Sequence, residues 1–131
     1  MTEAQSIAEL EETPPFGALL AGVTELRPIY EEHLDDNGNL LTHVLMGDVA
    51  RFFNQCVHES SGDGPESRRA AEIVRQILAV FEDAVASGDP GMLELVSASF
   101  LENLDQDASY DEVRKLLGPN LQRQLELVED G

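Results

Sequence analysis

Apolar residues recur at the spacing of an α-helix along most of the chain, and nowhere do they alternate with polar residues at the period of a strand. In residues 66–87, for example, apolar side chains fall three or four residues apart, which places them on one face of a helix. β-Branched residues also never cluster as strands require. The sequence therefore predicts an all-α fold.

Residues 25–57, ELRPIYEEHLDDNGNLLTHVLMGDVARFFNQCV, are the stretch around which we expect the other helices to be arranged. The pattern predicts a helix, a turn at Asn37 and Gly38, and a second helix over residues 40–58 that returns alongside the first. Whether residues 16–36 form one bent helix or two short ones stays open. The predicted inward stripe of the second helix consists of Leu41, Leu45, Val49, Phe52 and Cys56, widened by Val44, Phe53 and Val57.

We expect a single domain over residues 1–131, folded as one antiparallel helical bundle of five to seven helices, with residues 1–15 frayed. A chain of 131 residues is long enough to bury its own core. Residues 40–58, 66–87 and 92–104 should form that core. The Asp89-Pro90 pair predicts the start of a helix, and two capping boxes, Thr2 with Gln5 and Ser109 with Glu112, predict two more.

The charge balance restricts the classes of partner. The chain has 26 acidic and 8 basic residues, a formal net charge of −18, so phosphate backbones and anionic lipids should be repelled. We therefore expect no nucleic acid and no membrane as partner, whereas a basic protein would be attracted. Solubility alone explains the same charge and stays open as the simpler interpretation.

The cellular compartment is predicted from what the sequence lacks. No apolar run approaches the ~20 residues that cross a bilayer, and the N-terminal residues lack the pattern of a signal peptide. Cys56 is the single cysteine, so no internal disulfide can form. We expect a cytoplasmic protein.

Histidines and carboxylates are the candidates for metal chemistry. One alternative function is a metal-dependent helical enzyme in which His33 and His43, on either side of the predicted turn, act with Asp36 or Asp48. However, the sequence contains neither of the ligand pairs C-x-x-C and H-x-x-x-H that make a zinc site convincing. We therefore expect no metal and no cofactor.

Two other chemical interpretations fail on the sequence. Asp35, Asn37 and Asn39 match the first ligand positions of a calcium-binding EF-hand, but Leu40 stands where glycine is required and the final glutamate is missing. Cys56 lies in the apolar stripe, which predicts a buried and unreactive thiol. Because no nucleophile elbow or phosphate-binding loop occurs either, we expect a protein that is not an enzyme.

An acidic surface along residues 25–48 remains as the candidate site. It would bind a basic protein partner, with Tyr30 as an aromatic anchor if that side chain faces outward. A structural module that forms homodimers is a further alternative. The predicted partner-binding residues are Glu25, Tyr30, Glu31, Glu32, Asp35, Asp36 and Asp48.

The stretch ELRPIYEEHLDDNGNLLTHVLMGDVARF resembles a family of small acidic helical bacterial proteins of unknown function. Its members carry a helix ending in YEEH, an acidic Asn/Gly turn and an apolar helix with an MGD-like step. The later segments ELVSASFLENL and LGPNL look like the matching second half, and no functional residue is carried over. Such proteins are similar in type to immunity proteins, which plug the active site of a toxin. The resemblance thus favours an immunity-type inhibitor of a basic toxin or nuclease.

Overall fold

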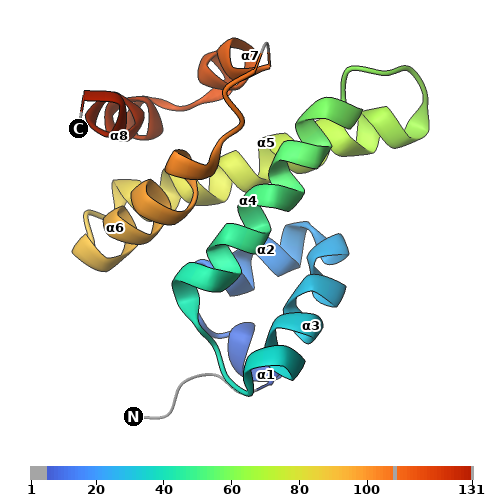
Figure 1. Ribbon diagram of the computed structural model, residues 1–131, viewed down its shortest axis with the longest axis vertical. Helices are drawn as coiled ribbons and strands as arrows, with labels where there is room; N and C mark the ends of the chain where they lie inside the picture. The colour runs from blue at the N-terminus through green and yellow to red at the C-terminus, as the bar shows by residue number, and fades with distance from the viewer. Residues whose placement is uncertain (1–5, 108, 131) are drawn as a thin grey trace.

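Eight α-helices and two short 3-10 helices make up a computed structural model that describes residues 6–107 and 109–130 (Figure 1). No strand occurs among these residues, and the predicted all-α helical bundle is confirmed. The helix count exceeds the expected five to seven because residues 16–36 are divided between short elements. These elements are α2 (Phe16–Gly22), η1 (Thr24–Leu26) and α3 (Arg27–Asn37). The others are α1 (Ile7–Leu10), α4 (Thr42–Glu59), α5 (Pro65–Ala86), α6 (Pro90–Ser99), η2 (Leu101–Asn103), α7 (Tyr110–Leu116) and α8 (Pro119–Asp130).

The helices α4 and α5 form the centre of the molecule and make its most extensive contact (Figure 1). On one side, α2 packs on α5 and α3 packs on α4; on the other, α6 contacts both and α8 covers α5 and α6. The rings of Phe53, Phe81 and Phe100 meet where α4, α5 and the end of α6 converge, with centroids 5.0 and 4.4 Å apart. The three segments expected to form the core therefore do so.

The limits of α5 follow from its flanking residues. Gly64 precedes the helix with a φ of 115°, and Pro65 occupies its first position, where a missing N–H costs least. Gly88 then takes a φ of 76° just beyond the last turn. The predicted span, residues 66–87, is thus correct to within one residue. None of the described helices has the length and apolarity needed to cross a membrane.

The buried face of α4 differs from the predicted stripe. Leu41 and Val44 are exposed, and Phe52 is only half-buried. Met46 and Ala50, which the prediction left out, are fully enclosed. The periodicity predicts the helix correctly. Which side of α4 is covered depends on α3, α5 and α6, whose positions the α4 sequence alone does not determine.

Neither predicted capping box is seen as a capping bond among the residues that the structure describes, for different reasons. Thr2 and Gln5 lie outside the described residues, and α1 is capped instead by Ser6, whose hydroxyl oxygen accepts the N–H of Glu9 at 3.3 Å. Ser109 makes no capping bond to α7, and its hydroxyl instead donates to Oδ1 of Asp107 at 2.5 Å. The helix nevertheless begins directly after Ser109, so the predicted start is correct and only the capping bond is absent.

The Asp89 cap of α6 is confirmed. Its Oδ2 accepts the N–H of Met92 at 2.9 Å, which satisfies one of the free donors in the first turn. The start of α6 is therefore fixed directly after the end of α5.

Candidate functional site

The solvent-facing side of α3 carries the acidic residues that the sequence singled out. Glu31 and Asp35 form one pair four residues apart, and Glu32 and Asp36 form another, and all four side chains are exposed. The helix ends at the predicted turn, where Gly38 adopts a φ of 77° and donates its N–H to the carbonyl of Leu34. Carboxylates are thereby concentrated at the C-terminal end of one short helix.

A groove of about 530 Å³ runs between α3 and α4, and we call it the α3–α4 groove. Glu32 and Asp36 line it from α3, and Asp48 lines it from α4. Arg51 is the one cation among the described lining residues, and it is ion-paired with Asp48. The structure therefore brings three of the predicted site residues to a single hollow.

Tyr30 is the clearest correction to the predicted site. Its side chain is completely buried, and its hydroxyl donates to the carbonyl oxygen of Phe16 at 2.9 Å. The two rings meet edge to face, with centroids 6.0 Å apart, and burial raises the pKa of the Tyr30 phenol. Because Tyr30 lies on the same inward face as Leu26 and His33, it fixes α3 to α2 and cannot anchor a partner.

Glu25 is separated from the other acidic residues. Its carboxylate accepts two hydrogen bonds from Arg69 of α5, both at 2.7 Å, and this bidentate contact lowers the pKa of Glu25. Arg69 also pairs with Glu72 at 3.0 Å. Glu25 therefore connects η1 to α5 and lines a different hollow, so it does not belong to the α3–α4 groove.

His33 has a structural part in the turn. It is buried, and its Nε2 accepts the N–H of Leu41 at 3.0 Å. The amide nitrogen of Asn37 donates to the backbone carbonyl of His33 at 2.9 Å. Burial lowers the pKa of the His33 imidazole, although the charge of Asp36 acts in the opposite direction. An unprotonated His33 thus holds the residues that follow α3 against that helix.

His43 does not join His33 in a ligand set. The Nδ1 of His43 lies 2.5 Å from Oγ of the buried Ser99 on α6. Neither histidine belongs to a group of three converging ligands in the described part of the chain. The geometry thus gives no support to the metal-dependent alternative built on these two residues.

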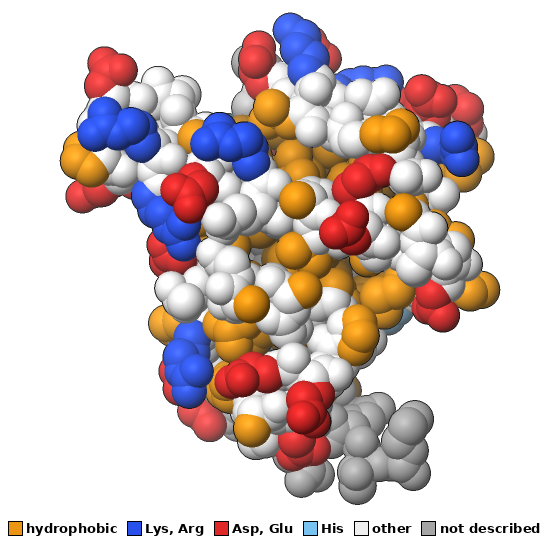
Figure 2. Space-filling view, turned by 180° about the vertical axis from the view of Figure 1, so that it is seen from behind, with side chains coloured by type: hydrophobic (Ala, Val, Ile, Leu, Met, Phe, Trp, Pro, Cys, Tyr) orange, Lys and Arg blue, Asp and Glu red, His pale blue; other side chains and the backbone are white. Residues whose placement is uncertain are grey.

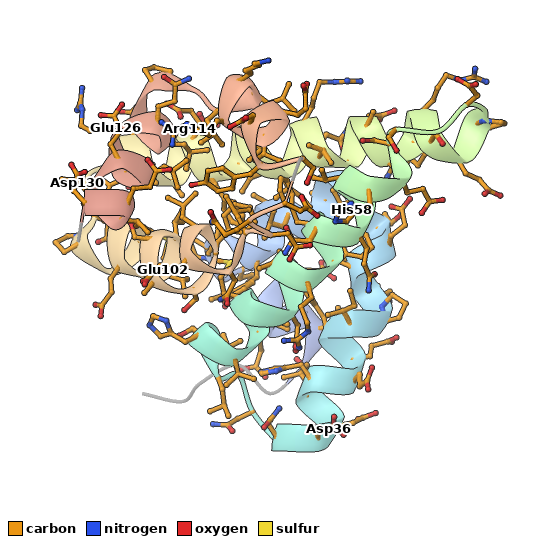
Figure 3. All side chains as sticks on the ribbon, turned by 45° about the horizontal axis from the view of Figure 1, so that its top comes forward. Asp36, His58, Glu102, Arg114, Glu126 and Asp130 are labelled. Atoms are coloured by element: carbon orange, nitrogen blue, oxygen red, sulfur yellow. The ribbon has the colours of Figure 1, made fainter. Side chains whose placement is uncertain are left out.

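A different cluster of possible ligands does converge, and no local sequence pattern indicates it. The Nε2 of His58 lies 3.2 Å from carboxylate oxygens of both Asp105 and Asp107, and the three side chains are exposed. Figure 3 shows His58 at the C-terminal end of α4, well away from Asp36 at the end of α3. The imidazole of His58 lies between the two carboxylates and can contact both. Because 47 residues separate His58 from Asp105, only the tertiary structure reveals the contact.

Cys56 is buried as predicted, with 7% of its surface exposed. Burial raises the pKa of its thiol to about 11, and the nearby charge of Glu59 adds to the shift. The thiolate is the nucleophilic form of cysteine, so this residue is poorly suited to attack a substrate near neutral pH.

These features define an all-α helical bundle with an acidic groove between two helices. The chain belongs to the family described as domain of unknown function DUF7674, which matches residues 16–129. The match spans both halves of the resemblance and confirms that the chain belongs to an uncharacterised family. No curated protein and no solved structure matches the chain.

Proposed function

We propose that this chain is a non-enzymatic protein-binding domain and that its α3–α4 groove takes a basic segment of a partner protein. The observation that carries the proposal is the convergence of Glu32, Asp36 and Asp48 on one groove. Three carboxylates against the single guanidinium of Arg51 leave the lining with a formal charge of −2. Such a groove favours a lysine or arginine side chain over an anionic one.

Apolar surface beside the carboxylates supports the same partner chemistry. Ile29 and Phe52, both half-buried, line the groove, and Val44 at its edge is 51% exposed. Lysine and arginine pack their aliphatic stems on apolar surface while the charged group reaches an anion. A groove with both kinds of lining therefore fits a long basic side chain better than a small cation.

The net charge of the chain extends this local preference to the approach of the partner. A formal charge of −18 attracts basic proteins over distances of about one Debye length, ~8 Å at physiological salt. The most concrete form of the proposal is an immunity-type inhibitor, active in the cytoplasm of a bacterium, that covers the basic surface of a toxin or nuclease.

Affinity capture from the native host tests the proposal. The tagged chain is incubated with lysate at low salt, and retained proteins are identified by mass spectrometry after elution with increasing salt. We expect a basic protein that elutes at moderate salt and is retained poorly by the E32Q/D36N variant. If wild-type protein retains nothing at low salt, or if both forms retain the same protein equally, the proposal is wrong.

A further inference from the structure

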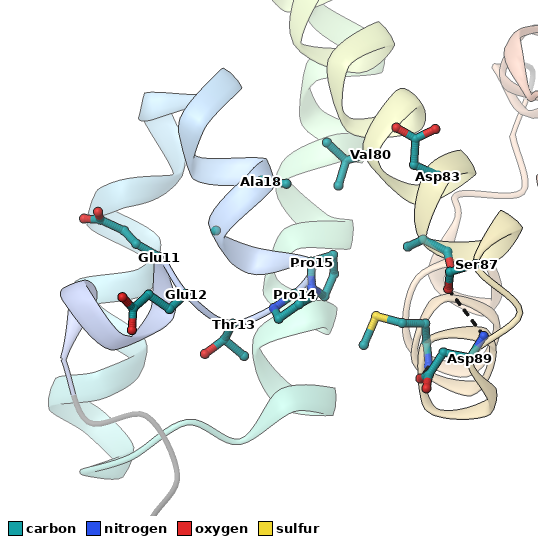
Figure 4. Close-up of a pocket in the computed structure, with 13 residues that line it drawn as sticks. Glu11, Glu12, Thr13, Pro14, Pro15, Ala18, Val80, Asp83, Ser87 and Asp89 are labelled. Carbon is teal, nitrogen blue, oxygen red and sulfur yellow. Dashed lines mark hydrogen bonds between the residues drawn. The ribbon is translucent and has the colours of Figure 1, made fainter.

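A second groove, with a different lining, lies between the segment that joins α1 to α2 and the pair formed by α5 and α6 (Figure 4). Its volume is about 630 Å³, within the range of ~300–1,000 Å³ typical of ligand pockets. We call it the α2–α5 groove. Its apolar floor is formed by Pro14, Pro15 and Ala18 on one side and by Val80, Ala84 and Met92 on the other.

The groove is hollow because the facing positions carry small side chains. Ala18 of α2 and Ala84 of α5 both line the groove, and their short side chains do not fill the space between the two helices. Val80 and Met92 at its floor are only half-buried. On the face of the molecule drawn in Figure 2, hydrophobic side chains gather in the middle. A concave, mostly apolar surface with a few polar groups around it is typical of a binding site.

The rim of the α2–α5 groove is acidic on both sides. Glu11 and Glu12 lie on one bank, and Asp83 and Asp89 lie on the other. The lining that the structure describes contains no lysine, arginine or histidine. Asp89 caps α6, whereas Glu11, Glu12 and Asp83 make no ion pair with residues 6–107 or 109–130. The rim thus combines four negative charges with an apolar floor.

We propose that the α2–α5 groove docks an amphipathic helix of a partner protein, with apolar residues on the floor and lysine or arginine residues against both banks. Charge complementarity selects this occupant, since carboxylates on both sides repel a fatty acid or an acidic segment. A neutral apolar molecule would leave the rim unused. An apolar helix face in an apolar groove is a common mode of peptide recognition. The proposal concerns a surface separate from the α3–α4 groove and holds independently of it.

Fluorescence anisotropy with synthetic peptides tests the docking. The probe is a labelled peptide of about 18 residues with leucines at i, i+3, i+4 and i+7 and lysines on both flanks of that stripe. One control peptide has the same composition in scrambled order, so that the leucines no longer share a face. A second control replaces every lysine with glutamate. We expect the probe to bind at least about tenfold more tightly than either control at low salt.

Two variants locate the binding on the protein. Ala18→Trp fills the groove from an exposed position of α2, and Ala21→Trp places the same side chain on that helix outside the groove. We expect A18W to weaken probe binding about tenfold or more and A21W to leave it unchanged.

Charge-matched variants test the rim. E11Q/E12Q/D83N removes three rim charges, and E94Q/E102Q/E126Q removes three charges from exposed positions elsewhere. The first should weaken binding about tenfold at low salt and little at high salt, while the second should have a much smaller effect. Should A18W fail to fold, the rim variant decides, because it changes only exposed side chains.

Equal affinity for the probe and its scrambled control would overturn the proposal, and so would wild-type binding by both A18W and the rim variant. E32Q/D36N, which alters only the α3–α4 groove, should bind the probe as tightly as wild type. Its behaviour distinguishes a failure here from a failure of the proposed function.

Discussion

Single buried polar residues hold the acidic end of α3 in place. The Nε2 of His33 can accept the N–H of Leu41 only while it is unprotonated. The folded state lowers the pKa of His33 below its ordinary value of 6.5, chiefly through burial. The stability that His33 contributes is therefore fully present above pH 6.5 and is lost as the pH falls toward the lower pKa of the folded state.

A comparison with His33→Gln tests this linkage, because glutamine offers an acceptor for the Leu41 N–H and does not titrate. Urea unfolding is measured for both proteins between about pH 7.5 and about pH 5.5. We expect wild type to lose stability relative to H33Q as the pH falls. A difference in unfolding free energy that stays constant over this range would contradict the role given to His33.

Removing the hydroxyl of Tyr30 should lower the free energy of unfolding more than removing the hydroxyl of Tyr110. Tyr30→Phe removes the phenol hydrogen bond to the carbonyl of Phe16 in a buried site and should cost about 1–2 kcal/mol. Tyr110→Phe removes a hydrogen bond to Glu129 at the surface and should cost less. Chemical denaturation of the two variants measures the loss of unfolding free energy in each. An equal loss would argue against a buried hydrogen bond that connects α3 to α2.

At the scale of elements, a carboxylate of α5 helps to hold the start of α8 in place. Glu82 of α5 accepts the N–H groups of Asn120 and Leu121 at 3.1 and 3.0 Å, and thereby caps the first turn of α8. Burial raises the pKa of Glu82, but the hydrogen bonds from Leu121 and Asn120 outweigh it, and the net pKa lies below the ordinary 4.5. The cap is thus an ionised carboxylate.

Glu82→Gln should weaken the attachment of α8 to α5. The amide group presents donors to a site that needs acceptors, so we expect a loss of about 1–2 kcal/mol and faster hydrogen exchange at Asn120 and Leu121. Asp83→Asn, at the next and exposed position, serves as the control.

The effect of Glu82 should also depend on pH. Its stabilisation is present above pH 4.5 and is lost as the pH falls through the lower pKa of the folded state. The gap in unfolding free energy between wild type and E82Q should therefore narrow in acid. A gap that widens in acid would contradict the assignment.

The junction of α1 and α2 depends on a glycine. A Cβ added at Gly17 would lie 2.0 Å from the carbonyl oxygen of Glu11, so the backbone would have to move. Gly17→Ala should destabilise the fold by about 2 kcal/mol or more. Gly47 in the middle of α4 has open space around it, and Gly47→Ala should stabilise the protein by up to about 1 kcal/mol. In thermal unfolding, the melting temperature should fall for Gly17→Ala and rise for Gly47→Ala. Stabilisation by both substitutions would contradict the close contact between Gly17 and the carbonyl of Glu11.

Local sequence signals predicted elements whose determinants are themselves local. The span of α5 and the cap of α6 follow from Pro65, Gly88 and Asp89, all next to the helices they delimit. The contacts of Glu82 with α8 and of Glu25 with Arg69 span about 40 residues and have no local signature. The acidic residues of α3 follow from local helical spacing. The burial of Tyr30 and the separation of Glu25 from the other acidic residues depend on tertiary contacts, so the sequence alone does not predict them.

At the scale of the whole molecule, the net charge differs between the two halves of the chain because the basic residues are unevenly divided. Residues 1–66 hold 13 acidic and 2 basic residues, a net charge of −11, whereas residues 67–131 hold 13 acidic and 6 basic residues, a net charge of −7. The α3–α4 groove lies wholly in the more acidic half. A basic partner should therefore be drawn to that half first, with an association rate that falls as salt is added.

The affinity of the captured partner for two charge-matched variants tests the proposed function most directly. E32Q/D36N removes two charges from the α3–α4 groove, and E94Q/E102Q removes two from exposed positions on α6 and η2, so both change the net charge equally. Isothermal titration calorimetry at low salt should show binding weakened about tenfold or more by the first variant and nearly unchanged by the second. Equal weakening by the two variants, or none by either, would show that the groove is not the binding site.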